Sequence, residues 1–284
     1  MAGIVSFFRT AYRKSDKVNE RVIAIDAGNS RIKIGLLDRT APTGNRPACH
    51  RDLVVPLGEP VPFDQLTNWV KQSEVPVVQV LLSGSNPPVI EEISALCEQH
   101  HLPEPCQVSR QLPLQIHVDF PDKVGMDRLL NAIGINAARP AERPAIVVSC
   151  GTACTVDLID GAGVFCGGSI LPGFEMSAKA LHHYTALLPR IPVEELSEAP
   201  SNGLGKNTRA ALQSGLFWGQ VGAVRELIQQ LSESLGAHQA TPDVYLTGGG
   251  ANLLSTQFPD AILEPHLTLY GIVLSALHQR SGHP

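Results

Sequence analysis

Residues 21–38, RVIAIDAGNSRIKIGLLD, decide the fold of this chain. Apolar residues from 22 to 25 lead into Asp26, small residues follow at 28–30, and from 32 to 36 apolar residues alternate with others. This pattern predicts a strand, a tight turn and a second strand. An aspartate at the end of a buried strand, followed by a glycine and two polar residues, raises the question of what this turn binds.

The same pattern occurs a second time at 145–160, AIVVSCGTACTVDLID. Both copies have an apolar strand, a glycine (Gly28, Gly151), a small polar turn residue (Asn29, Thr152) and a second alternating strand that ends in aspartate. Two such turns facing each other across a cleft could offer backbone N–H groups and hydroxyls to phosphate oxygens. Either turn alone is also what an ordinary hairpin contains.

A third glycine segment, VYLTGGGAN at 244–252, follows a predicted strand and precedes a predicted helix. Consecutive glycines let the main chain lie flat against a ligand such as a purine ring, at a cost in folding entropy. A lone run of glycines is often only a loop. In order with the two hairpins, however, it resembles the layout of the actin-like, sugar-kinase-like ATP-binding superfamily, in which two phosphate hairpins are followed by an adenosine loop.

Composition limits the other classes of function. With 284 residues, 43% of them hydrophobic and 17% charged, the chain is long enough for two domains. The net charge of -5 and the absence of a basic run argue against nucleic acid as a partner. No stretch approaches the roughly 20 apolar residues of a membrane span. A small anionic ligand remains possible.

The cysteines and the first residues indicate a cytoplasmic protein. Six cysteines show no C-x-x-C pairing, which is typical of reduced thiols. In residues 1–20 a short apolar run precedes the positive charges, the reverse of a secretory signal. We interpret residues 1–20 as a polar extension.

Strands and helices alternate along the chain, which predicts an α/β fold. The strand patterns lie at 22–26, 31–37, 76–83, 145–149, 155–159 and 243–247. Helical periodicity lies at 89–101, 125–138, 174–188, 206–236 and 268–280. The segment ARPAERPA, 138–145, breaks a helix and carries no core pattern, so we expect one domain at 21–140 and a second at 141–284.

Seven motifs, in this order, resemble those of the type III pantothenate kinases over residues 22–280. They are DAGNSRIK (26–33), PDKVGMDR (121–128), CGTACTVD (150–157), GGSILPGFEMSAKAL (167–181), LLP (187–189), GKNTRAALQSGLFWG (205–219) and YLTGGGA (245–251). The resemblance implies two ribonuclease-H-like (actin-like ATPase) domains with an ATP cleft between them. It also implies ATP-dependent phosphorylation of pantothenate, the first step of coenzyme A biosynthesis.

The resemblance gives the residues of the first hairpin a role in binding ATP. Asp26 would hold the Mg²⁺ that accompanies ATP, in keeping with the charge neutralisation that phosphoryl transfer needs. The remaining positions expected to bind ATP are Gly28, Asn29, Ser30, Lys33, Thr152, Gly248 and Gly249. The other interpretation of Asp26 is a turn carboxylate that accepts a hydrogen bond from its own backbone.

The GMDR segment supplies the substrate side of the predicted site. Because Gly125 opens a predicted helix, Asp127 and Arg128 fall in its first turn. The resemblance makes Asp127 the general base and Arg128 the partner of the pantothenate carboxylate. The residues expected at the substrate are Gly125, Met126, Asp127, Arg128 and Thr208. Alternatively, Asp127 only complements the helix dipole.

Two positions depart from the family pattern. In the internal alignment of the two hairpins, Ser149 stands opposite Asp26. At the position of Ser149 the resembling kinases have an acid that helps to hold a monovalent cation, K⁺ or NH₄⁺. Serine is a poorer ligand, so we expect weak cation dependence. The family often has a tyrosine seven residues before the glycine of GMDR, and this chain has Val118 there.

These departures leave a second class of function open, a nucleotide-binding regulatory protein on the same fold with little or no kinase activity. The resemblance further implies a homodimer with the pantothenate pocket completed near the subunit interface. The apolar run SGLFWGQVGAV at 214–224 fits such an interface.

Overall fold

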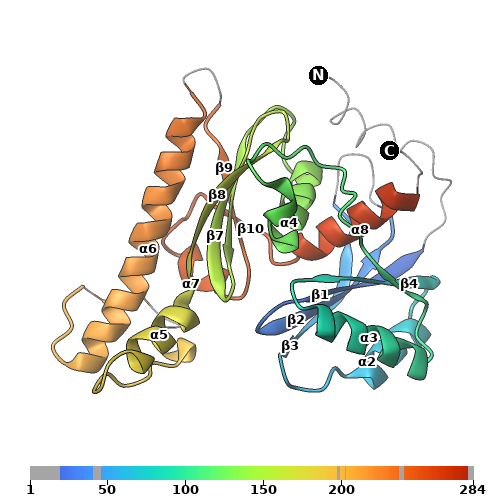
Figure 1. Cartoon of the computed structure of the whole chain (residues 1–284), viewed down its shortest axis with the longest axis horizontal. Helices are drawn as coiled ribbons and strands as arrows, with labels where there is room; N and C mark the ends of the chain where they lie inside the picture. The colour runs from blue at the N-terminus through green and yellow to red at the C-terminus, as the bar shows by residue number, and fades with distance from the viewer. Residues whose placement is uncertain (1–19, 41–45, 197–198, 202, 237–239, 281–284) are drawn as a thin grey trace. The chain divides into compact units, whose positions relative to one another are not determined.

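The structure is a computed structural model that describes residues 20–40, 46–196, 199–201, 203–236 and 240–280 (Figure 1). The extension predicted at 1–20 lies outside these ranges except for its last residue. The chain forms two compact units. Within the described ranges, the first unit comprises residues 20–141, 163–165 and 266–280, and the second comprises 142–162 and 166–265. Among the described residues, no helix has the length and apolar character needed to cross a membrane.

The first unit is built on a five-stranded sheet with the order β3-β2-β1-β4-β5. The first hairpin pairs β1 with β2 in antiparallel fashion, β2 pairs antiparallel with β3, and β4 and β5 continue the sheet in parallel. These strands are β1 (Arg21–Ala27), β2 (Arg31–Asp38), β3 (Cys49–Pro56), β4 (Val77–Gly84) and β5 (Pro105–Gln107).

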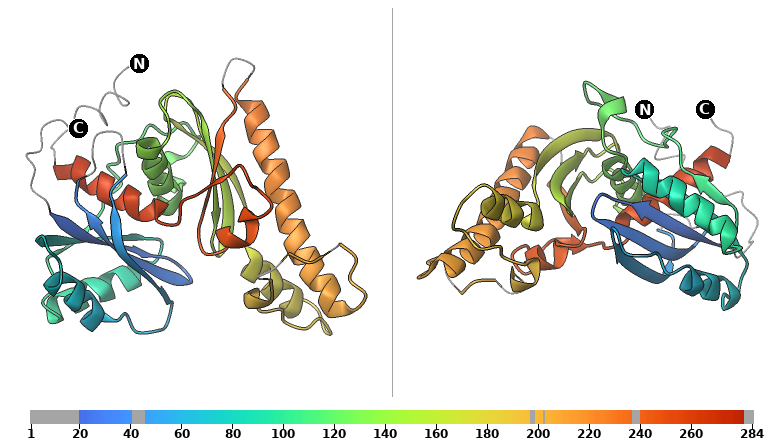
Figure 2. Two further views of the ribbon diagram at one scale, coloured as in Figure 1. Left: turned by 180° about the vertical axis from the view of Figure 1, so that it is seen from behind. Right: turned by 60° about the horizontal axis from the view of Figure 1, so that its bottom comes forward.

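Helices cover both faces of this sheet (Figure 2). On one face, Ile23 and Ile25 pack with buried side chains of α2 (Phe63–Lys71) and α3 (Pro87–Gln99). Alternation turns Ala24 and Asp26 to the opposite face. That face is covered by α8 (Leu267–Arg280), against which α4 (Met126–Ala138) packs. Asp26 therefore lies on the face of the sheet that α8 covers. The short 3-10 helix η1 (Pro121–Lys123) precedes α4.

The second unit repeats the strand order of the first. Its sheet has the order β10-β9-β6-β7-β8, which matches β5-β4-β1-β2-β3 strand for strand. Its strands are β6 (Ala145–Cys150), β7 (Ala153–Ile159), β8 (Phe165–Pro172), β9 (Asp243–Thr247) and β10 (Ile262–Leu263). The antiparallel pairing of β6 with β7 confirms the predicted second hairpin.

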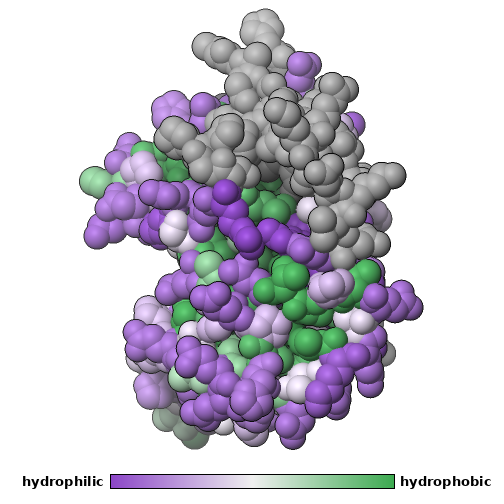
Figure 3. Space-filling model, turned by 90° about the vertical axis from the view of Figure 1, so that its right-hand side faces the viewer, coloured by the Kyte–Doolittle hydropathy of each residue, from purple (hydrophilic) through white to green (hydrophobic). Residues whose placement is uncertain are grey.

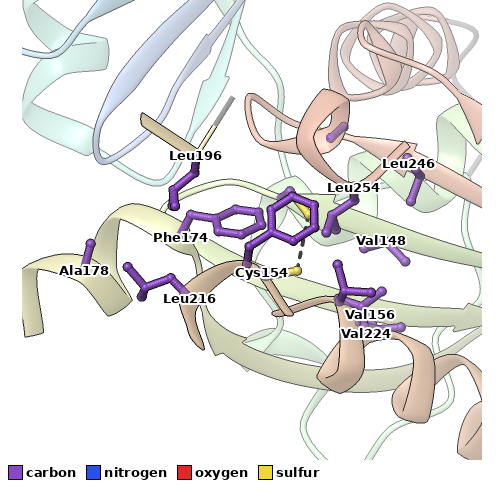
Figure 4. Packing of buried hydrophobic residues seen from close by; sticks show 14 of the residues in the cluster. Val148, Cys154, Val156, Phe174, Ala178, Leu196, Leu216, Val224, Leu246 and Leu254 are labelled. Atoms are coloured by element: carbon purple, nitrogen blue, oxygen red, sulfur yellow. Dashed lines mark hydrogen bonds between the residues drawn. The ribbon is translucent and has the colours of Figure 1, made fainter. Parts of the chain in front are cut away.

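The core of the second unit lies between this sheet and its helices. Figure 4 shows Phe174, Leu216 and Leu246 gathered around Cys154, with a dashed line marking the contact between the thiols of Cys150 and Cys154. The helices are α5 (Phe174–His183), η2 (Val193–Leu196), α6 (Thr208–Ser234) and α7 (Ala251–Ser255).

The structure differs from the sequence-based expectations where an element is exposed or short. No strand was predicted at β3 or β8, because their exposed residues interrupt any apolar run. The helix expected at 174–188 ends at His183, and Leu187 beyond it is 92% exposed. The second domain was expected to extend to residue 284, but α8 packs on α4 and on the first sheet. Its apolar side chains are thereby buried in the first unit.

The surface of the first unit is mixed in character. On the face shown in Figure 3, hydrophobic residues form small groups between hydrophilic ones. The exposed apolar residues of this unit include Val54 and Phe120.

Candidate active site

The first hairpin turns tightly at its glycine. The Gly28 amide donates to the Arg31 carbonyl over 3.0 Å, which closes the turn. A Cβ at Gly28 would lie 2.9 Å from that carbonyl oxygen, so a side chain does not fit without movement. Asn29 is exposed at the tip and Ser30 is half-buried. The polar side chains of Asn29 and Ser30 are therefore accessible at the tip of the hairpin, as the sequence predicted.

Asp26 is a buried carboxylate opposite a lysine. It lies directly across the hairpin from Lys33 and is only 7% exposed. Burial raises the pKa of Asp26 to about 6, the positive charge of Lys33 acts against this shift, and the negative charge of Asp127 adds to it. Of the described residues, none forms a hydrogen bond with the Asp26 carboxylate.

Gly84 allows the neighbouring strand to approach the end of β1. Its φ is +153°, and a Cβ there would lie 2.1 Å from the Ala27 carbonyl oxygen. The next amide, Ser85, donates to the same oxygen over 3.0 Å. Sequence reasoning missed this contact, and the only signal was a glycine at the end of a predicted strand.

Asp127 lies in the first turn of α4, as predicted. Gly125 is the N-cap, and a Cβ there would lie 2.6 Å from Asp127 Oδ1, so the carboxylate folds over the glycine. The helix is fixed by close packing on α8, where a Cβ at Gly271 would lie 2.0 Å from the Leu130 carbonyl oxygen. The Thr268 hydroxyl donates to Asn131 Oδ1 in the same buried contact. Asp127 thus projects from a rigid element.

Arg128 lies over an aromatic ring. Its guanidinium carbon is 5.5 Å from the centre of the Phe165 ring. The Phe165 backbone pairs with 115–117, because its amide donates to Gln115 and its carbonyl accepts from His117. Val118 follows directly on this segment. Phe165 therefore contacts both Arg128, through its ring, and the segment that leads into Val118, through its backbone.

Arg110 holds the loop before Gly125, which sequence reasoning did not anticipate. Its Nη2 donates to the Val124 carbonyl over 2.8 Å and to the Pro121 carbonyl over 3.3 Å. A single arginine in a loop gives no sequence signal for such a role. The contact fixes the approach of the chain to Asp127.

In the second unit, three glycine segments meet at the turn of the second hairpin. The Gly173 amide donates to the Thr152 carbonyl over 3.0 Å, and the Gly250 amide donates to the Cys150 carbonyl over 2.9 Å. Gly248 has φ +88°, and a Cβ there would lie 2.5 Å from the Cys150 carbonyl oxygen. Helix α5 begins directly after Gly173. The structure thus brings the second hairpin and the GGG loop, with its exposed Gly249, together.

Ser149 lies between two hydroxyl side chains of the second sheet. Its Cα partners are Thr155 on β7 and Thr247 on β9. Thr155 Oγ1 donates to Asp157 Oδ2 over 2.9 Å, and Asp157 is buried. Among the described residues, the buried Thr247 hydroxyl has no hydrogen-bond partner. Asp157 is an acid on the same face as Ser149 that sequence reasoning passed over.

Thr208 and Met126 both begin helices. Thr208 is the exposed first residue of α6, and the Asn207 side chain caps that helix by accepting from the Ala210 amide over 2.9 Å. Met126 is the half-buried first residue of α4. Thr208 belongs to the second unit, while Asp127 and Arg128 belong to the first.

Known proteins resemble this chain over most of its length. The family model for type III pantothenate kinase matches residues 22–230. A type III pantothenate kinase of Paramagnetospirillum magneticum is 32% identical over 93% of this chain and 98% of its own length. The corresponding values are 33%, 93% and 95% for the enzyme of Gluconobacter oxydans.

Solved structures share the fold at low sequence identity. A conserved Baf-family protein from Campylobacter jejuni has a TM-score of 0.57 and 18% identity, and the match covers 91% of this chain and 99% of that protein. The activator of the 2-hydroxyisocaproyl-CoA dehydratase from Clostridium difficile has a TM-score of 0.50 and 12% identity, with coverage of 92% and 96%. These likenesses show the two-domain actin-like ATPase fold. The family model and the relatives show that the chain belongs to the type III pantothenate kinase family.

Proposed function

We propose that Asp26, Lys33 and Asp127 form the catalytic centre of this kinase. As a member of its family, the chain transfers the γ-phosphoryl group of ATP to pantothenate in the first step of coenzyme A biosynthesis. One observation carries the assignment. Asp26 and Asp127 are about a hundred residues apart in sequence, yet the charge of Asp127 acts on the buried Asp26, which faces Lys33. The sequence relatives named above are all kinases, so they do not favour the regulatory alternative.

Asp127 is the proposed general base. The primary alcohol of pantothenate attacks the γ-phosphorus, its proton passes to the Asp127 carboxylate, and the bond from that phosphorus to the β,γ-bridging oxygen breaks to release ADP. The position of Asp127 supports this role, because the first turn of a tightly packed helix holds the carboxylate in one place. Gly125 leaves room for the carboxylate.

Asp26 is the proposed ligand of the divalent cation, either directly or through water. A buried carboxylate without a hydrogen bond from any described residue fits a cation partner, because its charge is otherwise uncompensated apart from Lys33. Mg²⁺ suits an oxygen ligand and would neutralise charge on the ATP phosphates. The positive charge of Lys33 favours the ionised form of Asp26 and so partly offsets the effect of burial on its pKa.

The glycine turns are the proposed phosphate and adenosine contacts. Gly28, Asn29 and Ser30 offer backbone and side-chain donors at the end of the first hairpin. In the second unit, Thr152 lies beside the start of α5, and the amides of a helix N-terminus favour an anion. Gly248 and Gly249 present bare backbone, which suits a flat ring.

Pantothenate recognition is proposed for Gly125, Met126, Arg128 and Thr208. Arg128 stands next to the base on α4, and its planar guanidinium is suited to a carboxylate. Thr208 lies on the second unit at the start of α6. We expect K⁺ or NH₄⁺ to matter little, because Ser149 has no charge at the position of the family's acid.

A homodimer and a cytoplasmic location complete the proposal. Gly215, Gly219 and Gly222 lie on one side of α6, and a Cβ at any of them would meet no atom of the described residues within 4 Å. The apolar side chains of the run at 214–224 (Leu216, Phe217, Val221 and Val224) are buried in the core of the second unit. The proposed dimer contact on α6 therefore rests on the exposed side that carries the three glycines. Light scattering of the purified chain tests this, since an active monomer would contradict it.

The cysteines support the proposed cytoplasmic location. The free cysteines suit a reducing compartment.

A coupled assay of ADP release tests the catalytic assignment. Wild-type turnover should depend on added pantothenate, and Asp127→Asn should lower kcat about 100-fold or more with little change in ATP binding. Asp122→Asn, an exposed acid in the same loop region, is the control and should keep most of its activity. Pantothenate-independent ATP hydrolysis in both proteins would favour the regulatory alternative instead.

A further inference from the structure

A cluster of three possible metal ligands lies on the first unit, on residues to which the kinase reaction gives no role. The Sγ of Cys49, a carboxylate oxygen of Asp52 and a ring nitrogen of His266 all lie within 4.8 Å of one another. Cys49 and Asp52 belong to the edge strand β3, and His266 directly precedes α8. We infer that Cys49, Asp52 and His266 form a binding site for a borderline-soft divalent cation such as Zn²⁺.

A β-bulge brings the two ligands of β3 to one face of the sheet. Residues three apart on a regular strand point to opposite faces. Here Asp52 is opposite Gly35 and Cys49 is opposite Leu37, with the register shift between Leu36 and Leu37. Because Gly35 and Leu37 share a face, their partners share it too. Bulges commonly redirect a side chain in this way.

The same face has room for the cluster because Gly35 has no side chain. A Cβ at Gly35 would lie 3.5 Å from Cys49 Sγ and 2.9 Å from Leu269 on α8. The glycine thus lets α8 approach the sheet, which brings His266 to β3. His50, the extra residue of the bulge, instead contacts Asp38 Oδ1 over 2.7 Å.

The distances suit tetrahedral coordination after small side-chain movements. Bonds of about 2.0–2.3 Å place two ligand atoms of a tetrahedral zinc site roughly 3.3–3.7 Å apart. His266 Nε2 and Asp52 Oδ2 are already 3.5 Å apart. Asp52 is exposed, so water has access as the fourth ligand. Coordination would release the thiol proton to solvent.

The chemistry of the three ligands separates this site from the Mg²⁺ proposed at Asp26. Thiolate sulfur and imidazole nitrogen select Zn²⁺ and similar ions, whereas Mg²⁺ prefers oxygen ligands. A thiolate and a carboxylate together balance the charge of the cation. The bound ion would join the edge strand β3 to the start of α8, so it should stabilise the first unit against unfolding.

Co²⁺ titration of the full-length protein under reducing conditions tests the site. Wild type should bind one Co²⁺ with a thiolate-to-cobalt charge-transfer band and the visible bands of tetrahedral cobalt. Cys49→Ser should lose the charge-transfer band, and Asp52→Asn and His266→Gln should weaken binding at least 10-fold. The matched controls Cys106→Ser, another half-buried cysteine, and His50→Gln should bind as wild type does.

Two further measurements test the site, and the first of them uses only the wild-type protein. Zn²⁺ should protect Cys49 of the wild-type protein from alkylation, read by peptide mass mapping, and leave Cys106 reactive. Zn²⁺ should also raise the thermal unfolding midpoint of wild type more than that of Cys49→Ser. The inference would be overturned by a wild type without the thiolate band, by a band that survives in Cys49→Ser, or by equal alkylation of Cys49 with and without Zn²⁺.

Discussion

Asp26 and Lys33 face each other directly across the first hairpin, at positions fixed by the register of β1 and β2. Burial raises the pKa of Asp26 to about 6, and Lys33 limits that rise. An ionised carboxylate in this buried position destabilises the apo protein, and a bound cation would offset that cost. The pair therefore links the stability of the first unit to its proposed chemistry.

Asp26→Asn should stabilise the apo protein at neutral pH. The folded-state pKa of Asp26 lies above its unfolded value of 3.8, so the folded state keeps a proton that the unfolded state loses as the pH rises from about 4 to 6. The free energy of unfolding therefore falls by about 3 kcal/mol between pH 3.8 and pH 6, because the folded state must then hold a buried charge. Asparagine removes the loss.

Urea unfolding of both proteins without nucleotide or Mg²⁺ measures this effect. In a Trp218→Phe background the fluorescence of Trp69 reports the first unit, where its side chain is buried. The free energy of unfolding of Asp26→Asn relative to the parent should be larger at pH 7.5 than at pH 4. A difference that is constant with pH, or equal to that of the surface control Asp260→Asn, would contradict the prediction.

Gly271→Ala should strongly destabilise the first unit and lower activity. The new Cβ would lie 2.0 Å from the Leu130 carbonyl oxygen, so α4 and α8 must separate. We expect a loss of about 3 kcal/mol in the free energy of unfolding, with a lower kcat because α4 carries Asp127. The matched control is Gly203→Ala, where a Cβ meets nothing within 4 Å. Calorimetry should show no marked shift for the control.

Arg110→Gln should lower kcat about 10-fold while leaving the KM for ATP nearly unchanged. Arg110 is a positioning residue, because it holds the Pro121 and Val124 carbonyls in front of the helix of Asp127. Arg110→Lys keeps one donor and should recover part of the rate. If kcat and the thermal unfolding midpoint fall in parallel in both variants, the role of Arg110 is merely structural.

Local patterns predicted the two hairpins, because a strand, a glycine turn and an alternating strand follow one another in sequence. They also placed Asp127 in the first turn of α4. The contacts of Gly84 with Ala27 and of Arg110 with Val124 could not be predicted, since each depends on packing between distant segments. The cluster at Cys49 also depends on a bulge, which shifts the register without a sequence signal.

The last prediction concerns Ser149, where the chain departs from its family. Ser149 lies between Thr155 and Thr247, and the hydroxyls of all three are weak ligands for a monovalent cation. A neutral residue at position 149 also repels the negatively charged ATP less than the acid of the family would. We therefore expect wild-type activity to vary little among K⁺, Na⁺ and a bulky organic cation at constant ionic strength.

Ser149→Asp should create K⁺ dependence, because the added carboxylate supplies both a ligand and a charge that needs compensation. The measurement is the steady-state rate against K⁺ concentration for both proteins, with ionic strength held fixed so that screening does not imitate a site. Ser149→Asn, which adds bulk without charge, is the control and should remain insensitive to K⁺. Saturable K⁺ activation of the wild type would instead point to the buried Asp157, which Thr155 contacts over 2.9 Å, as the acid that replaces the family's ligand.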